Sequence, residues 1–399
     1  MSAVSISTLK QEVKDLQEAI PNLETQSNTI LSPERIAENI SFSDAEPFST
    51  EGLENRIQEI GQTGYLMSLP KEMLFIIISN LLPSNVGILA RVSKNWKNLC
   101  DDYRYTLQRR HIDRIAKGQY TTNLLLGHGE KVDCLFEKEH VLYSGSIYNI
   151  KIWDMKTGQY TSTLWEEDKV NSLQIHGNFL YSCTWKTIKI RDLATMQCCA
   201  KLEGEHQKSS FYCILVEKDV IYTGTLDGKI LIWDVKTQRC VSTLHNDGGI
   251  RCLYKEKDFL YVGVSGKIVI WDVSTRKCIS AWQAHENDVY CLSKKGDVLY
   301  SSAFDCKIKI WNAATGKCTT TLEGHTGPVF QFFIDGYFLY SSSFDDTIKI
   351  WDLTTGECVA TLQGDQKGIL CMHKDEDILY SGGWDKSIKV WNFTASKSS

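Results

Sequence analysis

The sequence predicts an all-β propeller of seven blades, preceded by a small α-helical domain and by an acidic, mostly flexible N-terminal tail. Three observations support this fold class: a repeat with a period near 40 residues, a short and strongly apolar stretch before the repeats, and an uneven distribution of charge. The first 60 residues hold 4 basic and 11 acidic side chains, whereas the other 339 hold 40 and 38. We place the tail over 1–64, the helical domain over 65–117 and the propeller over 118–395.

The propeller prediction depends on a repeated pentapeptide. The segment IKIWD at Ile150–Asp154 recurs in six further variants, and its Trp position falls at residues 153, 191 (an Arg), 233, 271, 311, 351 and 391. Each copy contains four short runs rich in β-branched and aromatic residues, separated by turn residues such as Gly and Asp. Four strands in each of seven copies are typical of a seven-bladed β-propeller.

The last copy ends early, which predicts how the ring closes. It stops after SIKVWNFTASKSS and lacks a fourth strand, whereas residues 118–128 have the fourth-strand pattern but precede the first copy. We therefore expect 118–128 to pair with 387–393, so that no blade leaves an open sheet edge.

The repeats also contain Gly-His pairs at His128 and His325, with variants at His206 and His285, and they end in Trp-Asp. In these features the chain resembles the WD-repeat family. The resemblance implies that recurring His, Asp and Trp residues form structural hydrogen-bond chains rather than a hydrolase site, since one active site needs one copy and a scaffold needs one per blade. The implied sets are His285, Asp305 and Trp311, and His325, Asp345 and Trp351.

The Asp of this pattern is missing from three copies. Ile147, Trp185 and Ser265 stand where the other copies have Asp. We therefore expect blades one, two and four to be the looser ones.

Ten of the fourteen cysteines follow the repeat. One set lies seven residues after the Trp position (Cys198, Cys240, Cys278, Cys318, Cys358), and another lies 19 or 20 before it (Cys134, Cys213, Cys252, Cys291, Cys371). Residues phased in this way are expected to fill a packing position as small buried hydrophobes, rather than to bind metal or form disulfides. We expect no cofactor, no metal and a reducing compartment, cytoplasmic or nuclear.

Other classes of partner are disfavoured by composition. The propeller segment has no basic excess for a nucleic-acid backbone, and no window reaches the roughly 18 apolar residues of a membrane span. The N-terminus lacks the basic start and apolar core of a signal peptide.

The apolar stretch Ser68–Pro83 begins a second pattern. It combines Leu-Pro-x-Glu at Leu69–Glu72, a Leu-Pro break at Leu82–Pro83, and a Val-Ser-Lys-x-Trp run from Val92. This pattern resembles the F-box. The resemblance implies that an apolar surface docks a Skp-type adaptor and, through it, a cullin–RING ligase. The residues that would contact the adaptor are Leu69, Pro70, Met73, Leu74, Ile77, Ile78, Leu81, Pro83, Val92 and Trp96.

Two helices are expected beside this domain. Residues 101–117 alternate apolar and charged side chains and would link the helical domain to the propeller. In the tail, Leu9, Val13, Leu16 and Ile20 share one helical face. Two heptads leave open whether that face forms a homodimer, docks elsewhere or is only transiently helical.

The WD resemblance also implies where a ligand would bind. Two positions per blade point at the mouth of the narrow face: Asp133, Asn171, Tyr212, Arg251, Tyr290, Phe330 and Leu370 in the first strands, and Ser146, Thr184, Leu226, Val264, Phe304, Phe344 and Trp384 before the turn Asp. Receptors of this class that read phosphate resemble one another in having several Arg there, and this chain has one. We expect an aromatic pocket over blades five to seven, edged by Asp133 and Arg251, with Tyr212 beside it. Its ligand would be an apolar or aromatic degron, or a cation held over rings.

Together these patterns predict a non-catalytic substrate receptor of an SCF-type E3 ubiquitin ligase, with the F-box on the adaptor and the propeller on a protein substrate. The alternative is a WD-repeat scaffold that engages no cullin ligase.

Overall fold

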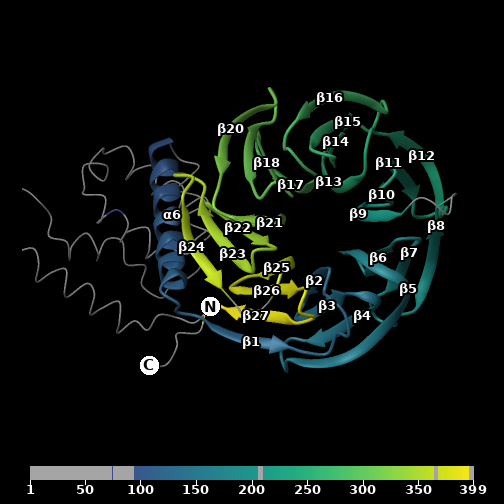
Figure 1. Cartoon of the computed structure of the whole chain (residues 1–399), viewed down its shortest axis with the longest axis horizontal. Helices are drawn as coiled ribbons and strands as arrows, with labels where there is room; N and C mark the ends of the chain where they lie inside the picture. The colour runs from purple at the N-terminus through teal and green to yellow at the C-terminus, as the bar shows by residue number, and fades with distance from the viewer. Residues whose placement is uncertain (1–73, 75–93, 205–209, 364–366, 395–399) are drawn as a thin grey trace, which may run out of the picture. The chain divides into compact units, whose positions relative to one another are not determined.

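The computed structural model describes residues 74, 94–204, 210–363 and 367–394. The chain divides into two compact units, Met1–Cys100 and Asp101–Ser399, and the second contains the propeller. The expected all-β propeller is confirmed (Figure 1). Within the described residues, no helix is long and apolar enough to span a membrane.

The strands follow the chain blade by blade. Blade one contains β2 (Cys134–Lys138), β3 (Val141–Gly145), β4 (Ile147–Asp154) and the start of β5 (Gln159–His176). Blade two contains the rest of β5, β6 (Phe179–Thr184), β7 (Thr187–Asp192) and β8 (Cys198–Glu203). Blade three contains β9 (Phe211–Glu217), β10 (Val220–Thr225), β11 (Lys229–Asp234) and β12 (Arg239–His245). Blade four contains β13 (Ile250–Glu256), β14 (Phe259–Val264), β15 (Lys267–Asp272) and β16 (Lys277–Gln283).

The remaining blades have the same order. Blade five contains β17 (Val289–Lys295), β18 (Val298–Ala303), β19 (Ile308–Asn312) and β20 (Lys317–Leu322). Blade six contains β21 (Val329–Asp335), β22 (Phe338–Ser343), β23 (Thr347–Asp352) and β24 (Cys358–Gln363). Blade seven contains β25 (Ile369–Asp375), β26 (Ile378–Gly383) and β27 (Ile388–Asn392), with β1 (Thr121–Leu125) as its outer strand.

The ring closes through β1 and β27. These strands pair antiparallel, from Thr121 opposite Asn392 to Leu125 opposite Ile388. An N-terminal strand thus supplies the outer strand of the last blade, and the two ends of the propeller segment are held side by side (Figure 1).

Blades one and two are joined by one unbroken strand, which the sequence analysis does not foresee. The 18-residue β5 pairs with β4 as far as Lys169 and with β6 from Val170, so the two blades form one seven-stranded sheet. The junction reads WEEDK, without the Gly-His turn that separates other blades at Gly324–His325. With no turn residue to break it, the strand continues.

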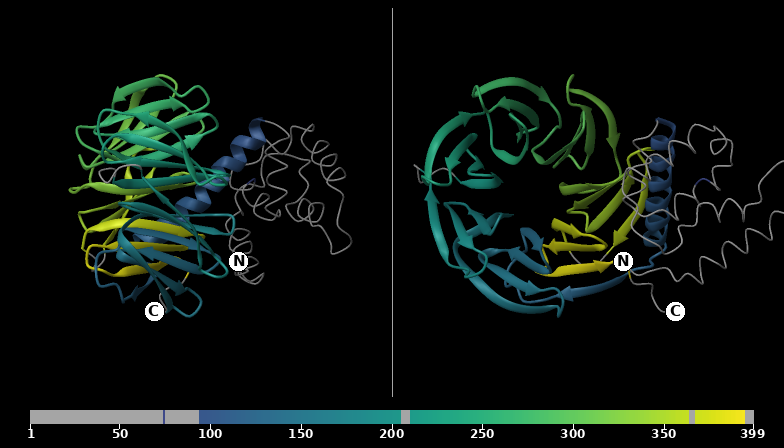
Figure 2. Two further views of the ribbon diagram at one scale, coloured as in Figure 1. Left: turned by 90° about the vertical axis from the view of Figure 1, so that its right-hand side faces the viewer. Right: turned by 180° about the vertical axis from the view of Figure 1, so that it is seen from behind.

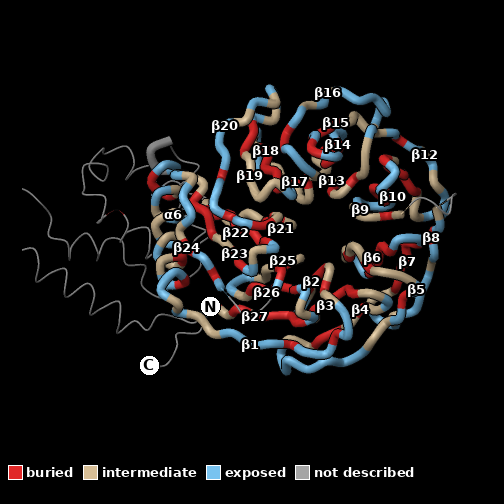
Figure 3. Tube along the Cα trace, in the orientation of Figure 1, coloured by how far each residue is buried: buried red, intermediate tan, exposed pale blue. Residues whose placement is uncertain are grey.

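The cysteines occupy two different environments, so the expectation of burial is only half right. Those of the inner strands are buried or half-buried, and Cys134, Cys252 and Cys371 each lie opposite a Gly whose added Cβ would come within 2.6 Å of the Sγ atom. The second set begins the outer strands, where Cys198, Cys278 and Cys358 are exposed. Outer strands are sheet edges, and much of their length is exposed (Figure 3). None of the fourteen cysteines, all of which lie in the described residues, forms a disulfide.

The linker helix expected over residues 101–117 is part of a longer helix, α6 (Lys94–Ala116), which begins before Asp101. Its part from Asp101 onward packs against blades six and seven (Figure 2). Tyr105 stacks on Phe338 at 6.1 Å, and Ile112 and Ile115 are 2% exposed in a core cluster with Trp391. Its docking face therefore comes from positions 105, 112 and 115, while Leu107 is exposed.

A buried carboxylate connects α6 to the propeller. Asp352 is fully buried and accepts hydrogen bonds from the Tyr105 hydroxyl at 2.6 Å and from Arg109 Nη1 at 3.0 Å. It also accepts bonds from the backbone and hydroxyl of Thr354. Burial works against the charged form, but the bonds from Thr354, Tyr105 and Arg109 lower the pKa of Asp352 below its usual value. The group therefore stays ionised at neutral pH and holds the helix through charge-assisted bonds.

Replacing Asp352 by Ala is expected to release this part of α6 from the blade. Two half-buried donors, the Tyr105 hydroxyl and Arg109, would lose their acceptor, at a cost of about 1.5 kcal/mol each, the lower end for bonds to a charged group. Amide hydrogen exchange over 101–116 should then accelerate by about tenfold or more. The control is Asp272→Ala, because Asp272 holds the same position in blade four and bonds Ser274 and Thr275 of its own turn. Equal protection of α6 in both variants would contradict the prediction.

Candidate functional site

One face of the propeller is built by a recurring β-bulge. In the first strand of six blades the register with the second strand skips one residue near the strand's start: Asn171, Tyr212, Arg251, Tyr290, Phe330 and Leu370. A bulge re-aims the extra side chain out of the ladder. These strands lie nearest the centre of the ring (Figure 1). We call the face formed by these residues and by the turns between second and third strands the narrow face.

The aromatic residues predicted on blades five to seven form one continuous arc. Tyr290 contacts Phe330 edge to face, with ring centroids 4.9 Å apart, and Phe304 at 6.3 Å. The line continues from Phe330 to Phe344 at 6.2 Å and from Phe344 to Trp384 at 5.8 Å, both edge to face. We call these five residues the aromatic arc. Edge-to-face contacts of this kind favour a fixed arrangement of rings.

The rings of the aromatic arc that belong to turns are exposed to solvent. Phe304, Phe344 and Trp384 are 48%, 44% and 51% exposed, whereas Tyr290 and Phe330 beneath them are half-buried. Gly368 allows the rings to approach, because a Cβ there would lie 2.7 Å from the Phe344 ring and its φ is +52°. Contiguous exposed rings on a folded domain are typical of an interaction surface.

Arg251 is fixed at one end of the arc. Its guanidinium lies 4.6 Å from the Tyr212 ring centroid and 5.8 Å from that of Tyr290, and its Nε donates to Asp288 at 2.9 Å. Burial raises the pKa of Tyr290 to about 12, so that ring stays neutral. Arg251 and Asp288 together contribute no net charge, and the two ring faces nearest Arg251 already hold a cation.

Two lysines at the other end of the arc were missed by the sequence analysis. Lys131 Nζ lies 4.1 Å from the Trp384 ring centroid and 3.7 Å from Asp133 Oδ1, and Lys169 Nζ lies 3.0 Å from the same oxygen. Burial raises the pKa of Asp133 although both lysines oppose this, and burial lowers the pKa of Lys131. Both lysines stand two residues before the inward-pointing position of consecutive blades, a spacing that could have identified them.

The other predicted narrow-face positions differ in role. Leu226 and Trp185 are exposed on blades three and two. Val264, Ser146 and Thr184 are buried, and the two hydroxyls bond the backbone at Lys131 and Thr187. These buried side chains hold turns in place and are not available to a ligand.

The His-Asp-Trp sets of blades five and six form hydrogen-bond chains. In blade six, His325 bonds Asp345 at 2.7 Å and Ser341 at 2.8 Å, and the Trp351 indole donates to Ser341 at 2.8 Å. In blade five, Ser301 accepts from the Trp311 indole at 2.8 Å, and His285 bonds Ser301 at 2.7 Å and Asp305 at 2.9 Å. Both serines are fully buried, so no substrate reaches them.

Blade two replaces this chain with a buried ion pair. Glu166 Oε1 accepts from Arg191 at 2.6 Å and from Ser182 at 2.8 Å, and Arg191 also bonds Ser182 at 3.0 Å. Glu166 thus occupies the position that His holds in blades five and six, and Arg191 occupies the position of Trp. Ser182 is the Ser that both contact. Lys189 lies 3.0 Å from the second Glu166 oxygen. The missing turn Asp therefore does not leave blade two without a buried polar connection.

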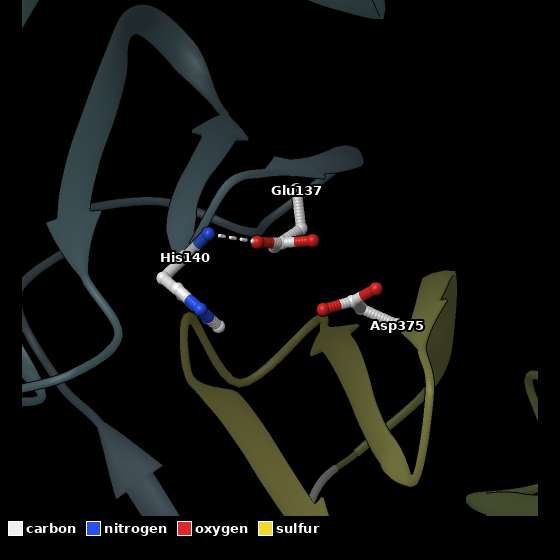
Figure 4. Close-up of side chains that lie close together, drawn as sticks. All are labelled: Glu137, His140 and Asp375. Carbon is white, nitrogen blue, oxygen red and sulfur yellow. Dashed lines mark hydrogen bonds between the residues drawn. The ribbon is translucent and has the colours of Figure 1, made fainter. Parts of the chain in front are cut away.

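A small acidic cluster lies at the opposite end of the strands. Glu137, His140 and Asp375 bring possible ligand atoms within 4.8 Å of one another, across blades one and seven (Figure 4). Glu137 accepts a 2.6 Å bond from the His140 backbone amide, so it already stabilises the turn between β2 and β3. Burial, with Asp375 nearby, raises the pKa of Glu137. These contacts describe a turn and give no independent sign of a bound ion.

The predicted adaptor residues lie mostly outside the described part of the chain. This holds for Leu69, Pro70, Met73, Ile77, Ile78, Leu81, Pro83 and Val92. Leu74 is buried, and Trp96 lies in α6 without a described side chain.

Comparisons with known proteins match three segments of the chain. The F-box domain model matches 66–107, a model described as the IP5P C-F beta-propeller matches 154–311, and the WD domain, G-beta repeat model matches 316–352 and 356–392. The computationally designed Ika8 protein has a crystal structure with a TM-score of 0.56 and 25% identity, covering 67% of this chain and 97% of that one.

Two curated relatives from Dictyostelium discoideum match shorter segments. Myosin heavy chain kinase C is 26% identical over 102 residues, and WD repeat-containing protein 89 homolog is 26% identical over 121. The matches cover 24% and 29% of this chain, and only 13% and 33% of the two relatives' own lengths. With its F-box domain followed by WD repeats that form a β-propeller, the chain is an F-box/WD-repeat protein.

Proposed function

We propose that this protein is the substrate-recognition subunit of an SCF-type E3 ubiquitin ligase. The F-box binds a Skp-type adaptor, and the narrow face of the propeller binds a protein substrate. One observation carries the proposal: an F-box over 66–107 directly precedes a WD propeller whose narrow face exposes a continuous arc of aromatic side chains.

The proposed mechanism is positional. The polar chains of blades five and six are buried scaffold bonds, and the narrow face offers rings and paired charges. The chain would therefore contribute by holding its substrate near the ubiquitin-loaded enzyme, which raises the effective concentration of the reacting groups. With this role we expect the protein in the cytoplasm or the nucleus, where its cysteines, which form no disulfide, would stay reduced.

The α6 contacts support this proposal. The second and third strands meet at the narrow face, whereas α6 bonds Asp352 and Tyr337, which lie at the turns of the opposite strand ends. A substrate on the narrow face would thus leave the helix docked.

The first test is calorimetric binding of the full chain to a purified Skp-type adaptor. We expect saturable binding of the wild-type protein to the adaptor. The affinity should fall by at least about tenfold in Leu69→Ala/Pro70→Ala, because removing apolar anchors from the centre of an interface commonly costs about 1–2 kcal/mol or more. The control is Val241→Ala/Ile279→Ala, which removes exposed apolar side chains from the outer strands β12 and β16. Absence of wild-type binding would favour the WD-repeat scaffold that engages no cullin ligase.

A further inference from the structure

The two ends of the aromatic arc differ in net charge. At the Tyr290 end, Arg251 is neutralised by Asp288. At the Trp384 end, Lys131 and Lys169 share one carboxylate, so this group of three has a charge of +1. The surface therefore offers a ligand a row of rings and one excess positive charge beside Trp384.

The positive charge is more accessible than the acid beside it. The Lys131 and Lys169 side chains are 23% and 17% exposed, whereas Asp133 is 10% exposed and its Oδ2 atom is buried. Both ammonium groups approach Asp133 through Oδ1, and each has three N–H donors. A ligand arriving on the Lys131 side of Trp384 would meet ammonium donors before the Asp133 carboxylate.

The charged groups beside Trp384 favour some classes of ligand over others. A ligand cation is disfavoured, since Lys131 already lies over Trp384 and Arg251 over Tyr212. A phosphate of nearly two negative charges exceeds the single excess charge, would approach the Asp133 carboxylate, and finds no Arg fork among the three residues. A carboxylate matches the charge of +1.

We propose that the narrow face binds an unmodified peptide in which an aromatic or large aliphatic side chain is followed or preceded closely by a carboxylate. The apolar side chain packs on Phe344 and Trp384, and the carboxylate accepts hydrogen bonds from Lys131 and Lys169. Lys131 Nζ is 4.1 Å from the Trp384 ring, and an extended chain advances about 3.3 Å per residue. The two groups therefore lie within about two residues. This inference rests on the proposed function, since it names the substrate class for the same face.

The carboxylate has two sources, an Asp or Glu side chain or the carboxyl end of a chain. Two synthetic libraries of random nine-residue peptides distinguish them, one ending in a free carboxylate and one in an amide. Each is applied to the immobilised full-length protein, and bound peptides are sequenced. We expect the amide library to enrich Trp, Phe or Leu beside Asp or Glu if a side chain is read. If a chain end is read, we expect the free-acid library to enrich an apolar last residue. Either result supports the proposal, and enrichment of Lys or Arg beside the rings would overturn it.

Variants then assign the two contacts. Lys131→Met leaves the Lys169–Asp133 pair intact at 3.0 Å. This variant should raise the Kd of the selected peptide by about tenfold. It should leave unchanged the Kd of the same peptide without its carboxylate. Phe344→Ala should raise the Kd of both peptides, with and without the carboxylate. The control Lys236→Met removes the same charge from an exposed lysine paired with Asp219. Thermal melting identifies any variant that fails to fold. If Phe344→Ala fails to fold, Trp384→Phe replaces it as the variant that alters a ring of the aromatic arc.

Two further results decide the inference. Tighter binding after the acidic residue is exchanged for phosphoserine would show a phosphate reader and overturn it. No enrichment by wild-type protein would also overturn it. Adaptor binding, measured on the same preparation, separates the proposals: a chain that binds adaptor but no such peptide keeps the ligase role and loses this substrate class, and the reverse keeps only the peptide site.

Discussion

Glu166→Gln is expected to lower the free energy of unfolding by about 3–5 kcal/mol, because it leaves the buried Arg191 cation without its partner and leaves Lys189 with only the contact to Glu167 at 3.5 Å. Glu166 is fully buried as a side chain, and Arg191 and Lys189 beside it are 6% and 11% exposed. Urea unfolding followed by tryptophan fluorescence measures the change. Because Glu166 lies in the part of β5 that joins blades one and two, we expect the loss to affect the whole seven-stranded sheet.

Companion variants test the physical reason. Arg191→Met should cost less, since Lys189 still pairs with Glu166. The double variant Glu166→Gln/Arg191→Met should recover part of the loss, because removing both members of a buried pair avoids an uncompensated charge. Lys201→Met breaks exposed pairs with Glu167 and Glu203 on the same blade, and it should lower the free energy of unfolding far less than Glu166→Gln does. Equal losses in Glu166→Gln and Lys201→Met would show that the pair does not stabilise the blade.

Removing β1 is expected to open the propeller. The five residues Thr121–Leu125 supply the outer strand of blade seven, and Leu125 is buried in a cluster with Leu135 and Trp153 of blade one. Their loss would expose the edge of β27 and the face of blade one. We expect a loss of about 5 kcal/mol or more, which is comparable with the 5–15 kcal/mol that holds most domains folded.

Two truncations isolate this effect. A chain starting at Gly118 loses α6 but keeps β1, whereas a chain starting at Leu126 loses both. Size-exclusion chromatography and urea unfolding should show a folded monomer for the first and aggregation for the second, because an unpaired strand edge templates association. A folded monomer without β1 would mean that the ring does not depend on this pairing.

Local patterns explain why the blades could be predicted. Strand alternation, turn residues and the Trp-Asp ending each act within one copy, and the copy that lacks a fourth strand predicts a partner from elsewhere. The aromatic residues of the narrow face follow from the same alignment, because a bulge recurs at one position in the first strands. In the structure these residues contact one another as a continuous arc.

The structure differs from the sequence-based prediction where a residue of one type occupies a position that another type holds in the other blades. Glu166 and Arg191 match neither His nor Trp by type, and only their contact with Ser182 shows the shared position. The exposed cysteines of the outer strands are phased as regularly as the buried ones, so phase alone could not distinguish an edge strand from an inner one. Lys131 and Lys169 stand two residues before Asp133 and Asn171, so neither belongs to the two positions per blade that were predicted to point at the narrow face.

The sequence by itself determined the number of blades, their order and the helical domain that precedes them, since these depend on periodicity and on turn chemistry encoded locally. The tertiary structure alone decided that α6 is held by Asp352 and that two lysines end the aromatic arc. Asp352 lies more than 240 residues after its α6 partners, and Lys131 meets Trp384 because the closed ring brings blade seven against blade one. No local pattern records a contact between residues so distant in the chain.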